Sequence, residues 1–211
     1  MERKRLLTWL VVISCIIIIA NVINDLTGRP YWQITRFINL DTESNFQTWF
    51  SGLILAIAAL YAYKCSVAVN KGRWAWRLFA LGLLGMSCDE VAMIHENVGL
   101  ALDRHFSIKA NWSMLFGPGL LIIILIFAIK LRGYLKGSAK AIWLLSLGAV
   151  VYVFGAFFLE STNNFLDFDR LKQLFQVEVF MEESFEILGV ITIISGLMEH
   201  HSFLTRQPAV K

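Results

Sequence analysis

The apolar residues of this 211-residue chain are gathered into long blocks, and this pattern constrains the fold more than any other feature. The chain is 57% hydrophobic and 17% charged, whereas soluble domains are about 45–50% apolar and about 25% charged. A helix of about 20 residues crosses the roughly 30 Å hydrocarbon core of a bilayer. The pattern therefore predicts one all-α integral membrane domain over residues 1–211, a bundle of six transmembrane helices at about 6–23, 46–63, 74–102, 112–131, 141–160 and 177–198.

The distribution of lysine and arginine predicts which side of the membrane each connection faces. Thirteen of the 19 basic residues fall at the N-terminus, in the second and fourth connections and in the tail, and six fall in the other connections. Cytoplasmic connections are enriched in lysine and arginine, so both the N-terminus and the C-terminus are expected in the cytoplasm. An even number of spans agrees with this. The chain is therefore expected to cross the membrane several times.

Acidic residues interrupt the apolar blocks, although an ionised side chain near the bilayer centre costs roughly 2.5–3.5 kcal/mol or more. The third block contains CDEVAMIHEN (88–97), the sixth contains EVFMEESFE (178–186), and the fifth ends at Glu160. On the predicted topology all three lie in the outer half of the membrane. Together they hold eight carboxylates, and these segments contain no lysine or arginine. Such a group must share protons, face water or hold cations.

Helical spacing arranges these acids in stripes. If the third block is one continuous helix, Asp89 and Glu96 lie seven residues apart on one face. In the sixth block Glu178, Glu182 and Glu186 follow an i, i+4, i+8 spacing. Two acidic stripes on different helices at a similar depth suit a metal site inside a helical bundle.

Oxygen ligands with one imidazole favour a divalent metal ion such as Zn, Mn or Fe. The expected metal ligands are Asp89, His95, Glu96, Glu160, Glu182 and Glu186. Glu90 and Glu183 are the expected catalytic residues, either of which would act as a general base towards a metal-bound water.

Four stretches carry a resemblance to known proteins: NFQTWFSG (45–52), CDEVAMIHE (88–96), GAFFLE (155–160) and EESFE (182–186). They resemble a group of uncharacterised small bacterial inner-membrane proteins with an Asp-Glu…His-Glu helix and a later Glu-Glu…Glu helix. The resemblance covers most of the chain. It implies a bacterial inner membrane and six helices, and it carries no activity over.

A second comparison fails residue by residue. Zinc membrane hydrolases of the alkaline ceramidase and adiponectin-receptor type share three histidines, including a His-x3-His pair. This chain has Glu182 and Glu186 at that spacing, and His95 is its one histidine within the acidic zone.

Three classes of function agree with these residues. The leading one is a membrane-embedded, metal-dependent enzyme with its carboxylate and histidine site in the outer half of the bilayer, acting on a lipidic substrate. The second is a proton- or cation-coupled transporter, for which a homodimer would supply the symmetry that one chain lacks. The third is a membrane assembly or binding subunit clamped by a cation. Membrane lipid is the expected surrounding partner, and no nucleic-acid partner is expected.

Overall fold

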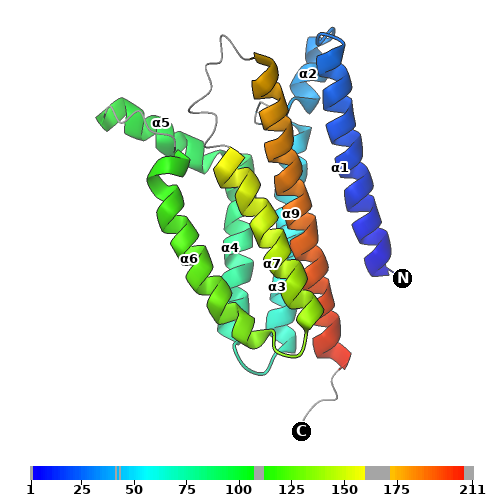
Figure 1. Cartoon of the computed structure of the whole chain (residues 1–211), viewed down its shortest axis with the longest axis vertical. Coiled ribbons are helices and arrows are strands. Elements are labelled where there is room, and N and C mark those ends of the chain that lie inside the picture. Colours follow the sequence, from blue (N-terminus) through cyan, green and yellow to red (C-terminus); the bar gives the residue numbers. More distant parts are fainter. Residues whose placement is uncertain (1, 41, 43, 107–111, 160–171, 207–211) are drawn as a thin grey trace.

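The chain folds as a bundle of long helices, as its sequence predicts (Figure 1). The computed structural model describes residues 2–40, 42, 44–106, 112–159 and 172–206. Within these ranges every regular element is a helix, which confirms the all-α class. The elements are α1 (Glu2–Leu26), α2 (Trp32–Ile38), α3 (Phe46–Ala68), α4 (Arg73–Ala92), α5 (Ile94–Phe106), α6 (Trp112–Tyr134), α7 (Ala139–Val153), the π-helix η1 (Phe154–Leu159) and α9 (Lys172–Arg206).

Several helices are long and apolar enough to cross a membrane. Four stretches pass this test alone: Glu2–Leu26, Phe46–Ala68, Gly117–Tyr134 and Ala139–Leu159. α4 and the Ile94–Leu102 part of α5 pass it only together. The described residues therefore contain four helices that are long and apolar enough to cross a membrane, or five if this bent pair counts as one. These stretches correspond to the first five predicted blocks. α9 covers the sixth block, and its 35 residues include five glutamates.

The third predicted block is wrong as one straight helix, because the chain turns at Met93. Met93 ends α4 in the left-handed backbone region, with a φ of 54°, and its N–H donates to the carbonyl oxygen of Asp89. A left-handed residue at this position is a common helix end. α5 then leaves at 66° to α4. Asp89 and Glu96 therefore do not share the face of one helix, since the helical repeat does not continue across the turn.

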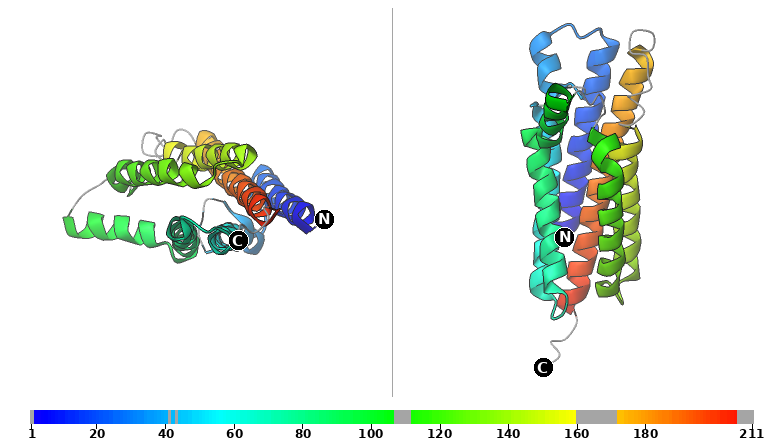
Figure 2. Two further views of the ribbon diagram at one scale, coloured as in Figure 1. Left: turned by 90° about the horizontal axis from the view of Figure 1, so that it is seen from below. Right: turned by 90° about the vertical axis from the view of Figure 1, so that its left-hand side faces the viewer.

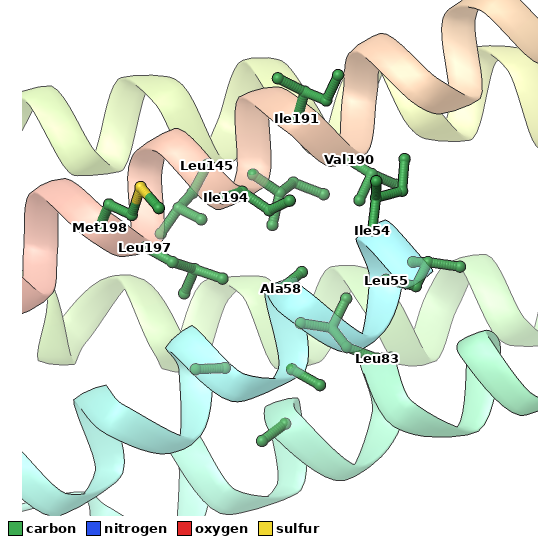
Figure 3. Close-up of a cluster of buried hydrophobic side chains, with 14 of the residues drawn as sticks. Ile54, Leu55, Ala58, Leu83, Leu145, Val190, Ile191, Ile194, Leu197 and Met198 are labelled. Carbon is green, nitrogen blue, oxygen red and sulfur yellow. The ribbon is translucent and has the colours of Figure 1, made fainter. Parts of the chain in front are cut away.

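The buried core lies where α3, α4, α7 and α9 meet (Figure 3). Ile54 and Ala58 of α3 and Ile194 of α9 have no exposed surface, and Leu83 of α4 and Leu145 of α7 are also buried. α3 thus packs on one side of α9 and α7 on another. This arrangement places α9 between α3 and α7.

Glycines allow α7 to approach α9 closely. A Cβ atom on Gly148 would lie 2.8 Å from the carbonyl oxygen of Gly189, and one on Gly189 would lie 2.6 Å from the backbone nitrogen of Tyr152. Larger residues would force the two helices apart. Small residues serve this purpose in membrane helix pairs, and here they bring α7 against the half of α9 that carries the glutamates.

The start of α1 and the end of α9 lie at the same end of the bundle (Figure 1). The Arg3 guanidinium lies 2.7 Å from the Glu199 carboxylate, and the Lys140 ammonium at the start of α7 lies 3.6 Å from it. The Arg3 guanidinium holds the pKa of Glu199 below its usual range. A Cβ on Gly72 would collide with Tyr134, so the α3–α4 turn and the end of α6 also lie together.

Candidate functional site

The turn at Met93 brings Asp89 into contact with His95. The backbone N–H of His95 donates to Oδ1 of Asp89 at 2.9 Å, and Nδ1 of the ring lies 2.8 Å from Oδ2. The Asp89 side chain thereby caps the first turn of α5, where backbone N–H groups have no partner within the helix. Glu96 also lies in that first turn, where a negative charge is favoured by the helix dipole. The acids of this stretch therefore stabilise a helix break as well as lining a site.

One glutamate of α9, Glu183, is held in place from α3. Gln47 is almost fully buried, with 2% of its surface exposed. Its side-chain amide donates to Oε2 of Glu183 and to the Ser51 hydroxyl, the latter at 3.2 Å. The bond between Gln47 and Glu183 links α3 to α9, although the two residues lie 136 positions apart in the sequence. Glu183, one of the two predicted catalytic residues, is thus positioned by a side chain from another helix.

A single cavity of about 850 Å³ collects the predicted site residues. Seven of the eight line it, contributed by α4, α5 and α9: Asp89, Glu90, His95, Glu96, Glu182, Glu183 and Glu186. The eighth, Glu160, lies outside the described residues. α9 and α4 are far apart in sequence, so this gathering is a product of the tertiary fold. The carboxylates and the imidazole form one polar end of the cavity.

The rest of the cavity is largely apolar. It lies between α4 on one side and α6, α7 and α9 on the other, which form two facing rows in Figure 2. Leu78, Phe79, Leu83 and Met86 line it from α4, and side chains of α6 and α7 complete the wall. Towards the end of α6 the lining includes Arg132. The cavity therefore joins an acidic end to an apolar passage.

Three lining or supporting residues escape sequence reasoning: Tyr152, Arg132 and Gln47. Tyr152 of α7 lines the cavity with the acids, and it stands two residues before the π-helix η1. Short π-helical segments occur frequently at functional sites. A tyrosine inside an apolar block is the signal that could have marked Tyr152. For Gln47, the corresponding signal is a glutamine at the start of an apolar block, in NFQTWFSG.

A close approach at Gly155 fixes η1 against the acidic part of α9. A Cβ atom there would lie 2.9 Å from the carbonyl oxygen of Glu182 and 3.0 Å from Cγ of Glu186. The absence of a side chain lets the backbone of η1 lie directly on the glutamate stripe. Glu182 and Glu186, both half-buried, are therefore confined between η1 and the cavity.

The predicted ligands line one cavity, but their side chains are not arranged as a metal centre. Among the residues that the structure describes, no group of three or more His, Cys, Asp or Glu side chains is positioned to hold an ion. Two of the predicted ligands, Asp89 and His95, are in direct contact. What this geometry provides is a hydrogen-bonded carboxylate–imidazole pair facing further carboxylates across a cavity.

The fold and the cavity define an all-α protein with several helices of membrane-crossing length around an acid-lined cavity. Residues 9–200 match the model of a domain of unknown function, DUF8692, and the chain belongs to that family. This confirms the expectation of a family that carries no established activity. No curated protein matches the chain. No solved structure matches it either.

Proposed function

We propose that this protein is a multi-pass protein of the bacterial inner membrane, with six spans and both termini in the cytoplasm. The thirteen-to-six distribution of basic residues supports this orientation. The start of α1 and the end of α9 lie at one end of the bundle, joined through Arg3 and Glu199, as an even number of passes requires. α9 would be the sixth span, with Glu182, Glu183 and Glu186 facing the cavity rather than lipid.

Within this frame, the function that the site supports best is a membrane-embedded, metal-dependent enzyme acting on a lipidic substrate. The observation that carries the proposal is that seven predicted site residues from three helices line one cavity whose remaining wall is largely apolar. Ionisable residues at depth in a membrane usually line functional cavities. Apolar pockets with a few convergent polar groups are the usual form of ligand sites.

The proposed roles follow from the contacts. Asp89 at Nδ1 of His95 is the arrangement that, in metal sites, orients an imidazole so that its other ring nitrogen binds the ion. Glu96, Glu182 and Glu186 would supply oxygen ligands, and Glu160 belongs to the proposed set. A bound divalent ion would lower the pKa of a water molecule. Glu183, held by Gln47, or Glu90 would then take its proton.

The experiment that tests this proposal is element analysis of the purified protein, combined with melting in detergent with and without a chelator. A ligand that binds only the folded state adds about 2.7 kcal/mol at a hundredfold excess over Kd. Chelation should lower the melting temperature of the wild type, and a transition metal should restore it. Both His95→Ala and Glu182→Gln should remove this response. Glu178→Gln is the matched control, because Glu178 lies on the same helix but does not line the cavity.

A proton-coupled transporter is the second candidate, favoured by the Asp89–His95 pair and by a cavity that extends from the acids to Arg132. In that case removing a carboxylate would relieve repulsion between like charges. Glu182→Gln would then be at least as stable as the wild type at neutral pH. A protein that contains no metal, does not respond to the chelator and is stabilised by Glu182→Gln would replace the enzyme proposal with proton coupling.

A further inference from the structure

The cavity has the length of a lipid chain. Its lining on α4 runs from Leu78 to Glu90, and a helical rise of 1.5 Å per residue makes this about 18 Å. One leaflet contributes about 15 Å of the bilayer's hydrocarbon core. A compact polar substrate would need only the acidic end of such a cavity. The apolar passage beyond it needs an extended, apolar occupant.

The cavity is also open to its surroundings through its side. Leu78 of α4 is 51% exposed, and Ile123 and Ile129 of α6 are 63% and 66% exposed, although all three line the cavity. α4 and α6 contact each other through Phe79 and Phe127, whose ring centroids are 5.9 Å apart. The passage is therefore bounded by two helices of the proposed transmembrane region, with apolar side chains facing both the cavity and the outside.

Gly82 marks the middle of the passage. It lines the cavity, and a Cβ atom built on it would meet no atom within 4 Å. Gly85, one turn further along α4, has the same open space but is not part of the lining. The two glycines therefore differ in whether a side chain added there would enter the cavity.

We propose that this cavity holds the hydrocarbon chain of a bilayer lipid, which enters between α4 and α6 and places its polar head at the acidic end. The inference rests on the membrane location given under the proposed function, but it does not require a bound metal. It names the substrate class of that site as a membrane lipid with a long chain and a hydrogen-bond-donating head group.

The chemistry at the two ends of the cavity determines which end holds the lipid head group. Burying a polar head group without hydrogen-bond partners is costly. The acidic end offers six carboxylates and the His95 imidazole, whereas the far end offers Arg132, an exposed side chain in the last turn of α6. A head group that carries an ammonium or hydroxyl groups matches the acidic end in charge and in hydrogen bonding. The chain then runs towards Arg132 through the apolar section.

Photo-crosslinking tests this proposal. The full-length protein is reconstituted in phosphatidylethanolamine bilayers that contain a phosphatidylethanolamine with a diazirine in one acyl chain, and the labelled residues are identified by peptide mass spectrometry. We expect labels on cavity-lining residues of α4 and α6. Gly82→Phe should reduce this labelling about tenfold, the change that corresponds to 1.4 kcal/mol of binding. Gly85→Phe should leave it at the wild-type level, and so should Arg132→Gln.

The following results would overturn the proposal. Equal cavity labelling of Gly82→Phe and the wild type would mean that no chain occupies the passage, as would labels confined to the outer faces of α1 and α6. A loss of labelling in Arg132→Gln that Glu182→Gln does not share would reverse the orientation. If Gly82→Phe fails to fold, Ala149→Phe, on the α7 wall of the cavity, replaces it.

The same labelling in the presence of a chelator separates this inference from the enzyme proposal. If the cavity is labelled in a protein that contains no metal, the lipid-chain proposal is supported and only the metal proposal is refuted. A metal-containing protein whose cavity is not labelled retains the proposed metal site and refutes the lipid chain.

Discussion

Asp89 holds His95 through two contacts across the turn between α4 and α5, one to the backbone N–H at 2.9 Å and one to the ring Nδ1 at 2.8 Å. On a continuous helix, six residues apart, these side chains would point in different directions. The left-handed conformation of Met93 is what turns them towards each other. The backbone carbonyl oxygen of Asp89 accepts the bond that ends α4. Its carboxylate caps the start of α5 and orients the only imidazole in the described cavity lining.

Removing this carboxylate should destabilise the protein through the lost cap. We expect Asp89→Ala to cost about 1–2 kcal/mol, in the range of a lost helix N-cap. Asp89→Asn keeps an oxygen that can accept the His95 N–H, so it should cost less. Melting in detergent, followed by circular dichroism, measures both. Equal destabilisation by the two substitutions would mean that the ring contact, rather than the cap, carries the stability.

The buried amide of Gln47 should couple α3 to α9. Gln47→Leu leaves the partly buried Glu183 carboxylate without this donor, which should cost about 1–3 kcal/mol. The exposed Gln33 of α2 offers a control, and Gln33→Leu should change stability by less than about 0.5 kcal/mol. A double-mutant cycle with Glu183→Ala gives the coupling energy of the pair, expected in the range of about 0.5–3 kcal/mol. Additive effects in that cycle would contradict the link.

Stability should fall in mild acid because of His200. This residue has no exposed surface and stacks on Trp76 with ring centroids 5.0 Å apart. Burial lowers the pKa of His200 to about 4 from an ordinary value of 6.5. A folded-state pKa below the unfolded value means that the stabilisation is present above pH 6.5 and is lost as the pH falls towards 4.

The expected loss from His200 between pH 6.5 and pH 4.5 is on the order of 2 kcal/mol, measured as the melting temperature in detergent across this range. Burial also lowers the pKa of His201, so His201→Asn serves as the comparison. The Glu199 carboxylate does not interfere, because its pKa is lowered below 4.5. His200→Phe should flatten the pH dependence more than His201→Asn does. An unchanged acid response in His200→Phe would show that another group is responsible.

The membrane topology can be tested with reporter fusions. Fusions at Asn70 and Gly137 should report the cytoplasm, because these turns lie at the end of the bundle that holds Arg3 and Glu199. A fusion at Gly28 should report the outside, and so should one between residues 160 and 171. An outside signal from the C-terminus would contradict the proposed orientation, because the Arg3–Glu199 contact places the end of α9 at the same end of the bundle as the N-terminus.

The sequence by itself determined the helical class and most of the helices that are long and apolar enough to cross a membrane. Hydropathy is a local property, so blocks such as 46–63 are visible without any knowledge of their neighbours, and α3 covers that block in full. Local reasoning of the same kind selected the candidate site residues. Charged side chains inside apolar blocks are costly wherever the helices pack, which is why Glu182 and His95 could be selected before the fold was known.

The tertiary structure alone decided how these residues meet. The turn at Met93 replaced a continuous helix because a left-handed cap held by Asp89 competes locally with helix propagation, and apolar periodicity carries no record of that competition. The pairing of Gln47 with Glu183 joins segments 136 residues apart. The cavity depends on how α7 lies against α9, which close contacts such as Gly148 against Gly189 set. Packing between distant segments fixes such relationships, and the pattern within any one segment does not contain them.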